Sequence, residues 1–97
     1  MIKVHQLKCW PAYFDPIVKG LKTYDLRKND RDFKVGDEVQ LEEWRPGTKQ
    51  YTGRLIRMRI VALLTKFEGL EEGYAILGLS PVDGEPPHGQ SDEPARA

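Results

Sequence analysis

The sequence predicts an α+β domain in which about five strands form one curled sheet or small β-barrel, with one short helix after the first strand. Two observations support this fold class. In residues 53–65, Ile56, Met58, Ile60 and Ala62 alternate with a second set of side chains, which is the period of a half-buried strand. Shorter apolar segments, separated by turns that contain glycine or proline, occupy the rest of residues 1–82.

The first strand is expected at residues 4–10, and Pro11 ends it because proline has no N–H for a ladder. A short helix follows. Its apolar face is predicted from the spacing i, i+3, i+4 and i+7 of Phe14, Ile17, Val18 and Leu21. Asp15 and Pro16 suit the N-cap and the first helical position. A helix that begins one turn before Asp15 is the alternative. Gly20 suits the position just past the helix end.

The remaining strands are expected at residues 23–28, 38–44, 53–65 and 74–82, and we expect all five strands to form one sheet. In the second strand, alternation separates two faces. Tyr24 and Leu26 lie on one face, and Thr23, Asp25 and Arg27 lie on the other. In the third strand, Val39 and Leu41 are expected to point inward.

Two regions differ in composition. Residues 1–82 form the predicted domain, and residues 83–97 form an acidic, proline-rich tail without aromatic residues, which we expect to be flexible. The tail has a net charge of −3, from Asp83, Glu85, Asp92 and Glu93 against Arg96. Because the whole chain is neutral, residues 1–82 sum to +3. This is mildly basic and well below the charge of a strong polyanion-binding protein.

Cysteine usage and hydropathy limit the function classes. Cys9 is the only cysteine, so we expect no intrachain disulfide and no zinc site built on a cysteine pair. No apolar segment approaches the roughly 20 residues of a membrane helix, and residues 1–8 lack a signal-peptide core. We therefore expect a cytoplasmic protein without a metal, cofactor or membrane partner. The oligomeric state is left open.

Polar chemistry concentrates where the predicted helix meets the second strand. Lys22 lies at this junction, and Asp25 and Arg27 share one strand face. An acid and a guanidinium group on a buried face are costly unless they pair or meet a ligand. Two interpretations stay open: a solvated face with a weak ion pair, or the wall of a cleft.

The spacing Gly-x-Lys-x-x-acid-x-Arg at Gly20, Lys22, Asp25 and Arg27 resembles the motif of the ASCH superfamily, a relative of PUA domains. The flanking segments resemble a bacterial and phage branch known as domain of unknown function 3850. They are His5-x-Leu7-Lys8-x-x-Pro11-x-x-Phe14, Arg27-x-Asn29-Asp30-Arg31-x-Phe33-x-x-Gly36-Asp37, Tyr51-Thr52-Gly53-Arg54 and Gly73-Tyr74-x-Ile76-Leu77. The resemblance spans residues 3–80. It implies a PUA-like barrel with a cleft beside the first helix and a role with RNA.

The candidate ligand-binding residues lie in or near this motif: Lys8, Trp10, Lys22, Asp25, Arg27, Asn29 and Arg31. Lys8 beside Trp10 suits base stacking, although Trp10 packing against the helix is the alternative. Arg31 suits a phosphate, and a structural turn at residues 29–31 is the alternative. We expect Arg27 to be held by Asp25, which leaves Lys22 as a free cation at the mouth of the cleft. Other polar residues are interpreted as structural: His5 in the barrel, and Arg54, Arg57 and Arg59 on a solvated outer face.

Three function classes follow, and the first is preferred. The first is an RNA-binding or modified-nucleoside-binding module. The second is a small hydrolase, which the resemblance suggests in the form of an acyl-cytidine amidohydrolase or a single-stranded ribonuclease. Lys22 matches the lysine of that amidohydrolase, but Asp25 falls where it has a threonine, so these two residues are catalytic candidates only if the protein is an enzyme. The third is a protein-interaction module of phage or bacterial origin.

Overall fold

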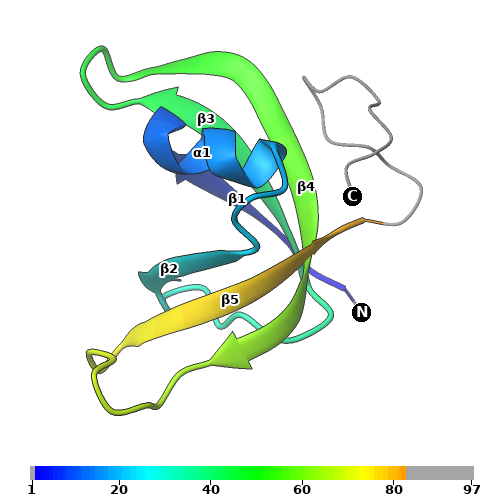
Figure 1. Cartoon of the computed structure of the whole chain (residues 1–97), viewed down its shortest axis with the longest axis vertical. Coiled ribbons are helices and arrows are strands. Elements are labelled where there is room, and N and C mark those ends of the chain that lie inside the picture. Colours follow the sequence, from blue (N-terminus) through cyan, green and yellow to red (C-terminus); the bar gives the residue numbers. More distant parts are fainter. Residues whose placement is uncertain (1, 83–97) are drawn as a thin grey trace.

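The chain has 97 residues, and a computed structural model describes residues 2–82. Its elements follow the order β1 (Val4–Cys9), α1 (Pro11–Val18), β2 (Tyr24–Lys28), β3 (Glu38–Arg45), β4 (Gln50–Leu64) and β5 (Tyr74–Pro81). The five strands form one curled sheet, as predicted, and the helix follows the first strand (Figure 1). The predicted tail, residues 83–97, lies outside the described residues.

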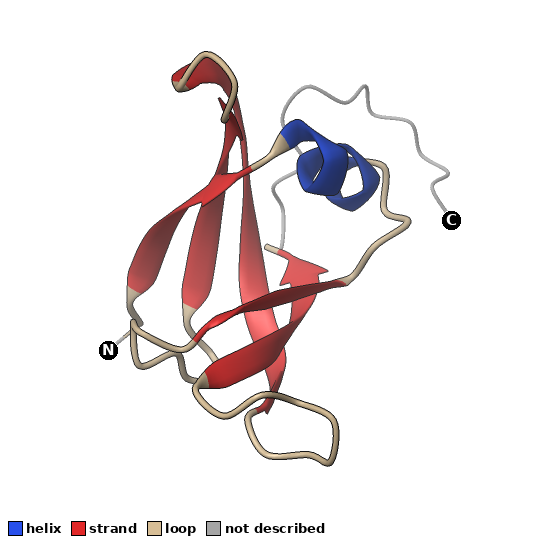
Figure 2. Cartoon of the chain, turned by 90° about the vertical axis from the view of Figure 1, so that its left-hand side faces the viewer, coloured by secondary structure: helices blue, strands red, loops and turns tan. Residues whose placement is uncertain are grey.

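The sheet order is β1-β3-β4-β5-β2, so the two strands nearest the N-terminus lie at opposite edges. β1 pairs with β3 in parallel, and the other neighbouring strands pair antiparallel. The curl of the sheet brings its two sides toward each other, with the helix near one open end (Figure 2). The result is a half-barrel whose edge strands β1 and β2 are not joined by a backbone ladder.

The concave side of the sheet holds the hydrophobic core, which α1 covers from one end. Its largest fully buried side chains are Phe14, Ile17, Val39, Leu41, Ile56, Ile60 and Leu77. Phe14 and Ile17 come from the helix face that the apolar spacing predicted, and Val39 and Leu41 point inward as expected. Burial of these apolar side chains is the main stabilising contribution in so small a domain.

The helix begins earlier than the sequence pattern suggested, so the prediction of Asp15 as N-cap is wrong. Trp10 occupies the N-cap and Pro11 the first turn, where its missing N–H would have no intrahelical partner. Pro16 lies inside the helix, where it removes one intrahelical hydrogen bond. The end is as predicted: Gly20 has a φ of 76°, which favours glycine. Because α1 ends at Val18, Leu21 does not join its apolar face and is exposed.

Two strands depart from the usual pattern of apolar side chains inward and polar side chains outward. In β2 the inward face is the polar one, with Asp25 buried, whereas Tyr24 and Leu26 are exposed. In β4 the predicted inward positions hold through Ile60, but the register shifts between Ile60 and Ala62. Ala62 is therefore exposed, contrary to the alternation, and Leu63 packs against the core instead.

A buried polar pair joins the start of β1 to the loop before β3. His5 Nε2 lies 2.9 Å from Asp37 Oδ2, and the His5 ring packs edge-on against Phe33. Burial favours a higher pKa for Asp37, but hydrogen bonds from His5 and from the backbone N–H groups of Lys3 and Lys34 outweigh it and hold the pKa below its usual range. This geometry agrees with the structural interpretation of His5.

Within residues 2–82, no helix has the length and apolar character needed to cross a membrane. In the same part of the chain, no group of three or more His, Cys, Asp or Glu side chains has the arrangement of metal ligands. The expected absence of a metal and of a cofactor stays a prediction.

Candidate functional site

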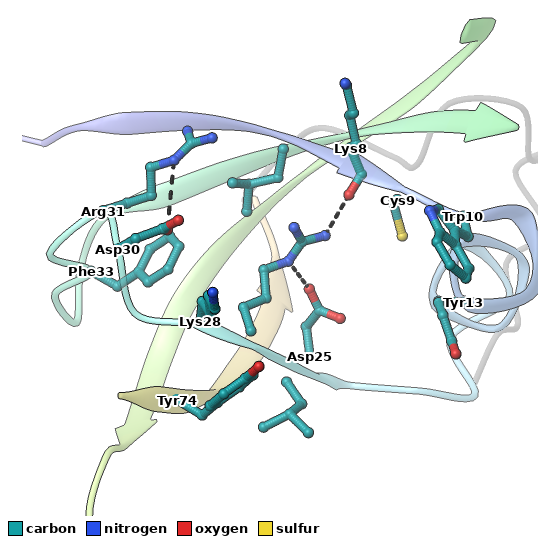
Figure 3. Close-up of a pocket in the computed structure, with 13 residues that line it drawn as sticks. Lys8, Cys9, Trp10, Tyr13, Asp25, Lys28, Asp30, Arg31, Phe33 and Tyr74 are labelled. Carbon is teal, nitrogen blue, oxygen red and sulfur yellow. Dashed lines mark hydrogen bonds and ion pairs between the residues drawn. The ribbon is translucent and has the colours of Figure 1, made fainter. Parts of the chain in front are cut away.

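A cavity of about 690 Å³ opens between the free edges of β1 and β2. In Figure 3 the ribbon of β1 passes on one side of the cavity residues and β2 on the other. The lining also includes the start of α1, the loop after β2 and the first residue of β5. Its residues are Leu7, Lys8, Cys9, Trp10, Tyr13, Asp25, Leu26, Arg27, Lys28, Asp30, Arg31, Phe33 and Tyr74.

An acid–guanidinium pair lies in the wall of this cavity. The Asp25 side chain is only 8% exposed, and Arg27 Nε donates to its Oδ2 at 2.5 Å. Arg27 Nη2 also donates to the backbone carbonyl of Lys8 at 2.7 Å (Figure 3). Burial of Asp25 decides between the two interpretations that the sequence left open. The pair belongs to a cavity wall, and it connects the two sheet edges.

A second arginine makes a similar connection. Arg31 Nη1 donates to the carbonyl of Gln6 at 3.2 Å, and its Nε lies 3.9 Å from Asp30. Gln6 and Lys8 are two residues apart on β1, so their carbonyls point to the same free edge of the strand. Two guanidinium groups thus span the gap where a closed barrel would have a backbone ladder.

An exposed aromatic pair lies at the helix end of the cavity. Trp10 and Tyr13 stack with their ring centroids 6.1 Å apart, and they are 48% and 51% exposed. Trp10 therefore packs against the helix, which was one of the two alternatives for this residue. About half of its surface is still exposed to solvent. Lys8 does not pair with Trp10. Its Nζ lies 4.4 Å from the ring centroid of Trp44 on the outer face of the sheet.

Lys22 lies near the cavity but is not among its lining residues. Its Nζ is 3.8 Å from Asp25 Oδ1 and lies over the rings of Tyr13 and Tyr24, at 4.9 and 5.4 Å from their centroids. Asn29 is also outside the lining, and its side-chain oxygen accepts from the N–H of Phe33 at 3.4 Å in a turn. The structure thus brings together five of the seven candidates, namely Lys8, Trp10, Asp25, Arg27 and Arg31.

Three other arginines contact acidic neighbours. Arg57 and Arg59 lie 3.7 and 3.3 Å from Glu38, and Arg54 lies 3.6 Å from Glu43. These contacts offset part of the positive charge on β4. The contacts of Arg57 and Arg59 agree with the structural interpretation of an outer strand face.

For Arg54 the prediction of an outer face is wrong. Its guanidinium group lies 5.0 Å from the ring centroid of the buried Phe14 and 3.6 Å from Asp15 of α1. The reason is that Arg54 shares the inward side of β4 with Ile56.

Cys9 contributes a sulfur atom to the cavity wall. Burial, followed by the nearby charge of Asp25, raises the pKa of the Cys9 thiol to about 11. The thiol therefore stays protonated at neutral pH, and a protonated thiol is a poor nucleophile.

Several lining residues were missed by sequence reasoning. Tyr13 was not among the candidate residues, although its position three residues after Trp10 is a signal for contact on a helix. Tyr74 has no local signal, because it reaches the cavity through the pairing of β5 with β2, where it faces Lys28. Such long-range placement follows only from the sheet order.

These features define a small half-barrel domain with a basic cavity that contains aromatic residues. The cavity lies at the open seam of the barrel, which is the gap between the edge strands β1 and β2. The sequence matches the family described as Domain of unknown function (DUF3850) over residues 4–79, and the chain belongs to this family. It is also similar to the "Uncharacterized 12.9 kDa protein in GpA 3'region" of Escherichia phage P2. The two are 36% identical over 77 residues, which cover 79% of this chain and 68% of the phage protein. The predicted resemblance to domain of unknown function 3850 is thereby confirmed.

Proposed function

We propose that this domain binds single-stranded RNA or a modified nucleoside, with one base held in the cavity between β1 and β2. The observation that supports this most is the composition of the cavity. It has an exposed aromatic pair at one end and a basic surface beside it. Its volume of about 690 Å³ is within the range of small-molecule sites, roughly 300–1,000 Å³.

Each part of the cavity has a role in this proposal. The Trp10–Tyr13 pair offers an apolar face on which a base stacks, and such stacking contributes roughly 1–3 kcal/mol per base. Lys28 and Arg31 line the cavity and suit a phosphate, with Asp30 as a partial counter-charge.

Asp25 is the polar group that suits recognition of the base itself. One carboxylate oxygen, Oδ2, is held by Arg27, so the orientation of the group is set before a ligand arrives. Among the described residues, the other oxygen, Oδ1, has only the longer 3.8 Å contact with Lys22, and it can accept from a base. A carboxylate pairs well with an exocyclic amino group such as N4 of cytosine. Cys9 in the cavity wall is not an activated nucleophile, because burial keeps its thiol protonated at neutral pH.

The same proposal includes a PUA-like fold of the ASCH superfamily. Its support is the motif Gly20, Lys22, Asp25 and Arg27 in the expected order, together with a curled sheet that has its helix after the first strand.

The test is a titration of fluorescently labelled tetracytidylate, followed by anisotropy at about 50 mM salt. We expect Trp10→Ala to weaken binding ~10-fold, which corresponds to the loss of one stacked base. Phe67→Ala is the control, because Phe67 is an exposed aromatic residue outside this cavity. No binding by the unmodified protein, or an equal loss in both variants, would contradict the proposal.

A further inference from the structure

A second cavity, of about 430 Å³, adjoins the first across the free edge of β1. Its lining consists of Gln6, Leu7, Lys8, Arg27, Arg31, Glu42 and Tyr51. Leu7, Lys8, Arg27 and Arg31 also line the first cavity. The two hollows therefore meet at the strand edge that the two arginines contact.

The two cavities lie on opposite faces of the sheet. Along β1, Leu7 and Cys9 are buried on the concave side, whereas Gln6 and Lys8 alternate outward. Figure 3 shows the Lys8 side chain directed away from Asp25, and the backbone carbonyl of Lys8 accepts from Arg27 Nη2. Glu42 lies on the same outward face of the neighbouring strand β3. A ligand that occupies both cavities must therefore cross the edge of β1.

Positive charge gathers where such a ligand would cross. Three cations, Lys8, Arg27 and Arg31, line the second cavity against one carboxylate, Glu42. Glu42 in turn accepts from the amide of Gln40 at 2.8 Å. A guanidinium group has five N–H donors. Within residues 2–82, the hydrogen bonds of Arg27 and Arg31 use only part of these donors, so both side chains can still donate to a phosphate.

An aromatic surface lies beyond these cations. Tyr51 lines the second cavity and is 54% exposed. It pairs across the β3–β4 hairpin with Trp44, the residue whose ring lies under the Lys8 ammonium at 4.4 Å. The order across the edge of β1 is thus an aromatic pair, a group of cations and a second aromatic residue. This alternation matches base, phosphate and base in a single strand.

From this arrangement we infer that the natural ligand is a single-stranded RNA of two or more nucleotides rather than a free nucleoside. One base occupies the first cavity, the following phosphodiester lies against Lys8, Arg27 and Arg31, and the next base stacks on Tyr51. The inference rests on the proposed function, because it extends the same site by one nucleotide.

The experiment compares cytidine monophosphate, the dinucleotide CpC and tetracytidylate by isothermal titration at low salt. We expect CpC to bind ~10-fold tighter than the mononucleotide, the gain of one stacked base. Tyr51→Ala should remove that gain and leave mononucleotide affinity unchanged, whereas Tyr51→Phe, which keeps the ring, should retain it. Tyr24→Ala is the matched control, since Tyr24 is also 54% exposed but lines neither cavity.

The outcomes separate the two proposals. If the mononucleotide and CpC bind equally, or if Tyr51→Ala and Tyr24→Ala behave alike, the second subsite is refuted while the first cavity stands. If none of the three probes binds, the proposed function itself fails, and the extended site fails with it.

Discussion

At the scale of single residues, Asp25 and Arg27 link the fold to the candidate site. A buried carboxylate is costly unless its charge is compensated, and Arg27 does this while it also contacts the carbonyl of Lys8 on the opposite sheet edge. Lys22, at 3.8 Å, is a longer and weaker partner of Asp25. The cavity wall therefore depends on a guanidinium group that also stabilises the domain.

We expect Arg27→Ala to lower the free energy of unfolding by about 1–3 kcal/mol, because it leaves a buried acceptor without its hydrogen-bonded partner. Urea denaturation measures this change. The double variant Arg27→Ala/Asp25→Asn should lose less than Arg27→Ala alone, since it removes the unpaired charge. Lys19→Ala is the control, as it breaks only the exposed pair with Asp15 and should cause no resolvable change. A control as unstable as Arg27→Ala would refute this account.

At the scale of elements, the close contact between β4 and β5 explains why residue 78 is a glycine. Gly78 pairs with Ala62 just after the register shift in β4. A Cβ atom at Gly78 would lie 3.0 Å from the Cβ of Ala62, closer than ordinary van der Waals contact. The strand pairing therefore limits the size of this residue, although its backbone angles do not require glycine.

Gly78→Ala should accordingly destabilise the domain by about 1–3 kcal/mol through overpacking, seen as a lower melting temperature. Adding Ala62→Gly removes the atom with which the new methyl group collides, so the double variant should recover part of the loss. Gly47→Ala, where a Cβ would have no neighbour within 4 Å, should melt like the unmodified protein. A neutral Gly78→Ala would show that β4 and β5 adjust freely at this position.

At the scale of the whole molecule, the open seam places a small number of cations beside the cavity. The domain is only mildly basic, with residues 1–82 summing to +3. Affinity for a single strand should therefore depend on few phosphate contacts and be micromolar or weaker, as the composition predicted.

We assume that Lys8, Arg27 and Arg31 each contact one phosphate. A plot of the logarithm of the binding constant against the logarithm of the salt concentration should then have a slope of about −2, because each contact on a single strand contributes about −0.7. Titration of tetracytidylate at several salt concentrations measures this slope. Lys8→Gln should make it shallower by roughly 0.7. A slope beyond about −4 would mean that many more cations take part than the two cavities contain.

The positions of the strands along the chain followed from local pattern. Alternation in β4 and the apolar segments around it predicted one curled sheet, because burial of one strand face imposes a period of two on the residues themselves. The end of α1, two residues before Gly20, was also predictable from a local signal, since the positive φ just past a helix end favours glycine. The helix start was not, because Asp15-Pro16 is as good a local signal as Trp10-Pro11.

Of the seven candidate residues, Lys8, Trp10, Asp25, Arg27 and Arg31 line the cavity, whereas Lys22 and Asn29 do not. The sequence by itself therefore determined the strand pattern, the position of the helix between the first two strands, and the pairing of Asp25 with Arg27 within the motif. Only the tertiary structure decided that β1 and β2 are opposite edges of one sheet, and that Tyr74 and Tyr51 lie beside the seam. The physical reason is that strand order depends on contacts between distant segments, which no local periodicity records.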